Sequence, residues 1–110
     1  MGLVLIIDTD IHPAVNRERL LDFLPEPWRT RVQRGNIGPG GLGYWNPNGV
    51  NRRDAITPDG RRIESAPELL AQFHLDTYGI DFAVLNPGGA LHIGLSPEPD
   101  FAASYCRAIN

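Results

Sequence analysis

The sequence predicts an α/β fold with two parallel strands, accompanying helices and a long irregular loop. Residues 3–8 and 80–85 are short, largely apolar runs, which are typical of strands buried on both faces of a parallel sheet. Helical patterns lie between and after them, and such alternation favours parallel βαβ units with a right-handed crossover. Because two strands cannot form a self-sufficient parallel sheet, we expect the chain to be the opening part of a larger α/β domain.

Length, charge and cysteine content exclude several classes of protein. The chain has 110 residues, which is room for one small domain. Its net charge of −3 gives no electrostatic footprint for nucleic acid or an anionic membrane, and no apolar stretch approaches the length of a membrane span. The single cysteine, Cys106, rules out an internal disulfide framework and suits a reducing cytoplasm, where we expect the protein to reside.

Two helices are expected after the first strand. Asn16 is a suitable N-cap for a helix over residues 17–24, which Pro25 ends. Pro27 suits the first turn of a second helix that runs to about Arg34, with Gly35 as its terminator. Residues 36–64 have no helical or strand periodicity. They are rich in the glycines and prolines that are typical of turns. A loop of about 29 residues is rare in a compact domain, so we expect a lid, a binding loop or a disordered segment, mobile and without regular structure.

The second half of the chain resumes a regular pattern. A capping box of Ser65 and Glu68 predicts a helix through Tyr78 that Gly79 ends. The second strand follows, and a last helix is expected to begin near Ser96. That helix carries apolar residues at helical spacing and is expected to bury Cys106 as a small hydrophobic side chain.

The candidate site lies at the end of the first strand. Asp8, Asp10 and His12 alternate with other residues, so strand geometry predicts that all three project to the same side. The carboxyl end of a parallel strand is where α/β proteins place their ligands, and two carboxylates with an imidazole make a partial divalent-metal site. The alternative without chemistry is that these residues end the strand and hydrogen-bond to nearby backbone in the turn before Pro13.

Two catalytic patterns match this motif in part. The haloacid-dehalogenase-type phosphatases resemble it through an apolar strand followed by Asp-x-Asp, which would make Asp8 the nucleophile and Asp10 the acid/base with magnesium. His12 and the Leu85-Asn86 end of the second strand depart from that family. Nucleoside hydrolases share Asp-Thr-Asp, but the acidic residues that complete their calcium site are missing here.

A third resemblance covers both ends of the chain. The segment from Ile7 to Pro13 (Ile-Asp-Thr-Asp-Ile-His-Pro) resembles the first-strand signature of the amidohydrolase superfamily, in the branch called amidohydrolase family 2. Residues 69–87, with Gly-Ile-Asp before an apolar strand, resemble the helix and second strand of that branch. Residues 107–110, Arg-Ala-Ile-Asn, resemble a segment that Asp-Trp commonly follows in it.

This resemblance implies that residues 1–110 are the incomplete N-terminal part of a single (β/α)8 barrel domain, a fold of about 250 residues. It implies a metal-dependent hydrolase, with decarboxylation as the variant chemistry, acting on a small organic and possibly carboxylate-bearing substrate. The metal pair of the family falls on Asp10 and His12, and one divalent ion, zinc or manganese, is implied. The remaining ligands would lie on later strands, so the chain alone is expected to be inactive. Because two parallel strands leave exposed edges and apolar faces, the isolated chain is also expected to be molten, to aggregate or to associate with other chains, for example as a homo-oligomer. The alternative from another class is a small α/β binding module without chemistry.

Other residues have two interpretations. His74 and His92 are expected to be surface or packing histidines. The arginine pairs at 52–53 and 61–62 could bind a substrate carboxylate or be solvated turn residues. Tyr44 and Trp45 could cap a pocket or contact a neighbouring subunit.

Overall fold

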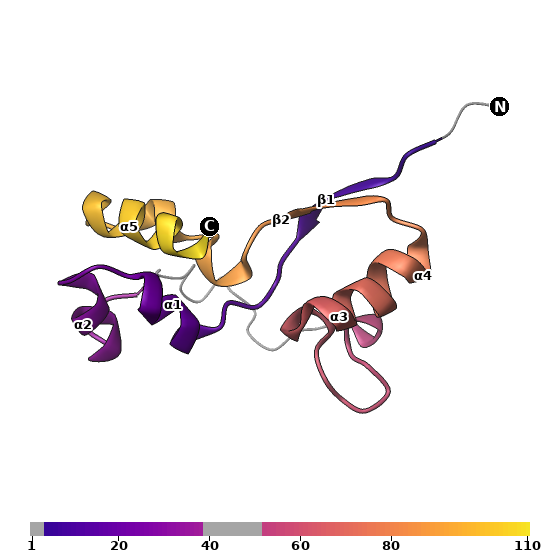
Figure 1. Cartoon of the computed structure of the whole chain (residues 1–110), viewed down its shortest axis with the longest axis horizontal. Coiled ribbons are helices and arrows are strands. Elements are labelled where there is room, and N and C mark those ends of the chain that lie inside the picture. Colours follow the sequence, from indigo (N-terminus) through magenta and orange to yellow (C-terminus); the bar gives the residue numbers. More distant parts are fainter. Residues whose placement is uncertain (1–3, 39–51) are drawn as a thin grey trace. The chain divides into compact units, whose positions relative to one another are not determined.

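The computed structural model describes residues 4–38 and 52–110 (Figure 1). The chain divides into two compact units. The strand unit comprises residues 1–14 and 48–86, and the helical unit comprises residues 15–47 and 87–110. No helix within the described ranges is long and apolar enough to cross a bilayer.

The sheet of the strand unit has two parallel strands, which confirms the predicted pairing. β1 (Ile7–Ile11) lies beside β2 (Phe82–Leu85), with Ile7 opposite Phe82 and an irregular register between Asp8 and Ile11 (Figure 1). β1 begins and ends later than the predicted residues 3–8, and before its start Ile6 donates its N–H to the Asp81 side chain. In the part of the chain described, large apolar side chains of both strands stay exposed, so the prediction of strands buried on both faces is wrong for this structure.

A helical stretch in three segments lies directly before β2 in the chain. It consists of α3 (Pro67–Leu70), a π-helical segment (Ala71–Leu75) and α4 (Asp76–Tyr78). Gly79 ends it with φ of 63°, a left-handed conformation that glycine adopts without strain, as predicted. The predicted capping box is wrong. Ala66 occupies the N-cap position without a side-chain hydrogen bond, because the Ser65 hydroxyl donates to the Arg62 carbonyl and closes the preceding 3-10 turn.

The loop before this helix contains only short local structure where it is described. Two 3-10 turns (Arg53–Ala55 and Ile63–Ser65) flank an antiparallel bridge between Ile56 and Arg62. The buried Thr57 stabilises the turn between the bridged residues by accepting the N–H of Arg61. The rest of the predicted mobile loop, residues 39–51, lies outside the described residues.

The helical unit begins with the two predicted helices. α1 (Arg17–Phe23) starts where Asn16 accepts the N–H of Arg19, the predicted cap. α2 spans Trp28–Gln33, and Gly35, whose φ is 72°, follows its C-cap residue Arg34. Two 3-10 turns (Gly88–Ala90 and Ile93–Leu95) precede the last helix, α5 (Pro99–Ile109). α5 begins later than predicted because the Ser96 hydroxyl accepts the N–H of Glu98 in a local turn.

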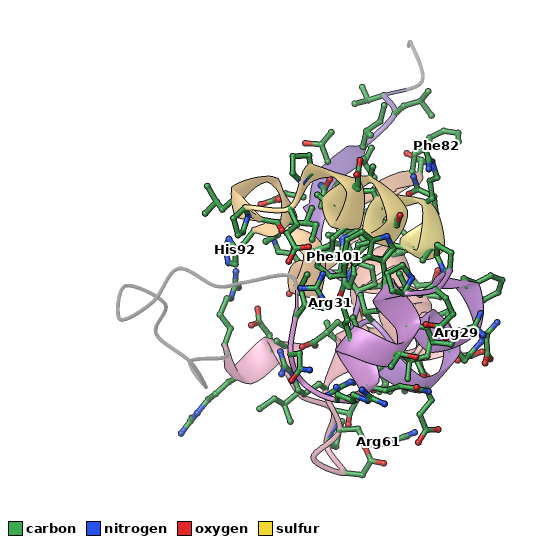
Figure 2. All side chains as sticks on the ribbon, turned by 90° about the vertical axis from the view of Figure 1, so that its left-hand side faces the viewer. Arg29, Arg31, Arg61, Phe82, His92 and Phe101 are labelled. Atoms are coloured by element: carbon green, nitrogen blue, oxygen red, sulfur yellow. The ribbon has the colours of Figure 1, made fainter. Side chains whose placement is uncertain are left out.

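Apolar side chains from these helices form the core of the helical unit. Phe101 is completely buried, and its ring centroid lies 5.6 Å from that of Trp28 and 5.5 Å from that of Tyr105 (Figure 2). Cys106 is exposed, so its predicted burial is wrong. It follows Tyr105 by about 100° around α5 and therefore leaves the face that Phe101 and Tyr105 turn toward the core. The other buried members of this core are Leu20, Leu24, Val32 and Ile93.

Candidate functional site

The candidate site occupies the edge of the sheet where both strands end. Asp8 and Asp10 belong to β1, His12 follows it directly, and Asn86 follows β2. Because the strands are parallel, their carboxyl ends meet at one edge, and the polar side chains after them come within hydrogen-bonding range. All four residues belong to the strand unit, so the site lies within one compact unit.

The imidazole of His12 is oriented by the backbone after β2. Its Nδ1 lies 2.7 Å from the Asn86 carbonyl oxygen, and a carbonyl can only accept, so Nδ1 carries a proton. Asn86 is itself fixed, because its N–H donates to Ile11 and its side-chain amide donates to Thr9. The sequence did not predict a role for Asn86 beside His12. Its place directly after the second parallel strand is the signal that could have indicated one.

The other nitrogen of His12 faces a carboxylate. Nε2 lies 3.3 Å from Oδ1 of Asp10, whose side chain is 79% exposed, against 41% for His12. In the neutral ring the single proton is on Nδ1, so the lone pair of Nε2 points toward Oδ1 of Asp10, which is also electron-rich. This arrangement is favourable only if Nε2 is also protonated or if a cation binds both atoms. The structure thus brings Asp10 and His12 together, as the sequence predicts.

Asp8 has different partners. Its Oδ1 accepts the backbone N–H of Asp10 at 3.0 Å, and its Oδ2 accepts Nε2–H of His74 at 2.9 Å. The hydrogen bond from His74, followed by that from Asp10, holds the pKa of Asp8 below its ordinary value. His74 also packs edge-on against Tyr78. It is therefore more than the surface or packing residue expected, and no local sequence signal could pair residues so far apart in the chain.

Within the described ranges, no group of three or more His, Cys, Asp or Glu side chains gathers to hold a metal ion. Asp10 and His12 therefore offer two ligand atoms, and the carboxylate of Asp8 is engaged beside them. A divalent ion bound to the pair would need further ligands from elsewhere.

Three of the loop arginines, Arg52, Arg61 and Arg62, are paired with nearby carboxylates. Arg52 forms a two-point ion pair with Asp54, and Arg61 lies 2.7 Å from Asp59. Arg62 pairs with Glu64. These pairs favour the interpretation as turn residues for the three arginines. A hollow of about 400 Å³ lies beside Arg52 and is also lined by His74, Tyr78 and Ile63.

The sequence offered His92 and the pair Tyr44 and Trp45 as further candidates. His92 belongs to the helical unit and is half-buried in a turn (Figure 2). Tyr44 and Trp45 lie outside the described residues, and the predictions about them stay predictions.

No model of a protein family matches the chain, and a search among curated proteins finds no match. The observations that bear on function are therefore the geometry at the end of β1 and the motifs in the sequence.

Proposed function

We propose that this chain contributes the first metal-binding pair of a metal-dependent, amidohydrolase-type hydrolase, with Asp10 and His12 as two ligands of one divalent ion. One observation carries the proposal. The Asn86 carbonyl fixes the proton of His12 on Nδ1, and the remaining nitrogen, Nε2, faces Oδ1 of Asp10 at 3.3 Å. The substrate would be a small organic molecule, for example one that bears a carboxylate, and decarboxylation is the variant chemistry.

The chemistry of the two donors fits such an ion. Histidines that bind metals usually donate their other ring N–H to a carboxylate or backbone carbonyl, which fixes the tautomer, and His12 makes this contact with Asn86. An imidazole suits zinc, whereas the carboxylate oxygen of Asp10 shifts the preference toward manganese. Once bound, the ion would supply Lewis acidity toward an oxygen of the substrate or of water.

Residues of this chain would orient the metal ligands and give the site its negative charge. Asn86 holds the ring of His12, and Asp10 adds the negative charge that attracts a cation to an exposed strand end. In the amidohydrolase arrangement, further ligands come from later strands of a (β/α)8 barrel. The parallel pairing of β1 with β2 supports that arrangement, since neighbouring barrel strands pair in this way.

The phosphatase alternative is less well supported. A nucleophilic Asp8 needs a carboxylate oxygen directed at phosphorus, and the hydrogen bonds that its two oxygens accept, one from Asp10 and one from His74, reduce the nucleophilicity of both. The alternative of a binding module without chemistry predicts instead that His12 is an imidazolium paired with Asp10 and that no ion binds.

The test is site-resolved metal binding by the 110-residue chain. Small additions of Mn²⁺ during ¹H–¹⁵N NMR should broaden the signals of residues around Asp10, His12 and Asn86 first, because paramagnetic broadening reports proximity. Asp10→Ala and His12→Ala should each weaken this binding about tenfold or more, since each removes one of two ligands. The control variant His92→Ala removes a histidine of the helical unit and should leave the broadening unchanged.

Unchanged broadening in Asp10→Ala and His12→Ala would refute the metal site. The phosphatase alternative is tested in a protein that carries the chain together with the rest of its enzyme. There, Asp10→Ala and His12→Ala should abolish activity, and Asp8→Asn should reduce it less. If activity survives the loss of His12 but not that of Asp8, the amidohydrolase assignment is wrong.

A further inference from the structure

Beside the Asp10–His12 pair lies a second polar pair to which the proposed function gives no role. His74 Nε2 lies 2.9 Å from Asp8 Oδ2, and both side chains are largely shielded, with exposed fractions of 27% and 29%. The histidine comes from the π-helical segment before β2, and such segments often occur at functional sites. The carboxylate comes from β1, so the contact ties the helix to the strand.

The pair is connected to Asp10 through the backbone. While Oδ2 of Asp8 accepts from His74, its Oδ1 accepts the N–H of Asp10 at 3.0 Å. The register of β1 against β2 is irregular between Asp8 and Ile11, so regular strand pairing does not order this stretch. The N–H of Asp10 is therefore held by the side chain of Asp8, two residues earlier.

We infer that His74 is a positioning residue for the Asp10–His12 site. By donating to Oδ2, it fixes the carboxylate of Asp8 in the rotamer whose Oδ1 holds the backbone of Asp10 in place. Its hydrogen bond also compensates a negative charge that would otherwise stand next to Asp10. The effect on a bound ion rests on the proposed function, whereas the effect on the backbone of Asp10 does not.

Two hydrogen bonds link His74 to Asp10 through Asp8, so the test uses variants of both His74 and Asp8. Loss of the imidazole should weaken Mn²⁺ binding about 10- to 100-fold, the range typical of residues that orient metal ligands. His74→Gln should recover much of the affinity lost in His74→Ala, because its amide N–H can still donate to Asp8. In an Asp8→Ala background, His74→Ala should have no further effect, since the intermediate contact is gone.

A measurement made without metal tests the positioning role of His74 separately from the proposed metal site. Hydrogen exchange of the Asp10 amide should be about tenfold faster in His74→Ala, while the amides of Phe82 and Val84 in β2 serve as references for the general stability of the strand unit. His92→Ala is the control for loss of a histidine elsewhere. If His74→Ala loses the fold, as its NMR spectrum would show, the same comparison is made with His74→Gln against Asp8→Ala.

Each result decides one question. If the Asp10 amide exchanges no faster than the β2 references in His74→Ala, the positioning role is wrong, whether or not Mn²⁺ binds. Faster exchange without metal binding in the wild-type chain supports the positioning role and overturns the proposed metal site. Faster exchange with weakened Mn²⁺ binding supports both, and equal Mn²⁺ affinity in His74→Ala and wild type overturns the inferred effect on the ion.

Discussion

Replacement of Phe101 by alanine should remove most of the stability of the helical unit. Phe101 is completely buried between the rings of Trp28 and Tyr105. Deleting a buried phenylalanine ring costs about 3–5 kcal/mol, because transfer free energy is lost and a cavity remains. The unit has roughly 60 residues, for which the usual 0.05–0.15 kcal/mol per residue gives about 3–9 kcal/mol in total. At the centre of both ranges, the substitution should therefore remove about two thirds of the stability of the unit.

The matched control is Phe82→Ala. Phe82 has the same side chain but is 59% exposed on β2, so its loss should change the free energy of unfolding by about 0.5 kcal/mol or less (Figure 2). Urea unfolding is followed by NMR signals of Leu24 and Tyr105 for the helical unit. A large drop of the urea midpoint in Phe101→Ala, with little change in Phe82→Ala, is expected. Equal midpoints for the two variants would refute the assignment of the core.

Three further predictions concern charge, exposure and association. Arg31 donates two hydrogen bonds of 2.6 Å to Glu98, and these hold the pKa of that carboxyl below its usual range. A depressed pKa stabilises the folded state above the ordinary pKa, near 4.3, so Glu98→Gln should lower the urea midpoint at pH 7. That difference should vanish as acid protonates Glu98; a difference that persists at pH 2 would contradict this account. Exposed Cys106 should react rapidly with a thiol reagent in the folded chain, and Cys106→Ser should leave stability within about 0.5 kcal/mol; slow labelling would indicate burial. Because apolar side chains such as Ile7 and Val84 stay exposed on open strands, the chain should associate with increasing concentration, and an Ile7→Thr/Val84→Thr variant should sediment closer to a monomer; a wild-type chain that stays monomeric would refute this.

The proximity of Asp10 and His12 could be predicted from sequence because it depends on a local rule. Residues two apart in a strand share a side, so Asp10 and His12 were expected together, and the structure places them 3.3 Å apart. The partners of Asp8 did not follow from this rule. Its carboxylate accepts hydrogen bonds from the backbone of Asp10 and from His74, contacts that depend on a local register irregularity and on a helix distant in sequence.

Local chemistry in the sequence determined several element ends and the presence of the two strands. The Asn16 cap, the glycines at 35 and 79 and the two apolar runs are enough to predict helix ends and parallel strands, because capping, left-handed φ angles and β-branched runs act over a few residues. Only the tertiary structure decided the contacts around them. The Asn86 carbonyl reaches Nδ1 of His12, and His74 reaches Asp8, because the parallel crossover joins segments that are far apart in the chain. Pairings of this kind depend on where whole elements pack, which the pattern of any one segment does not contain.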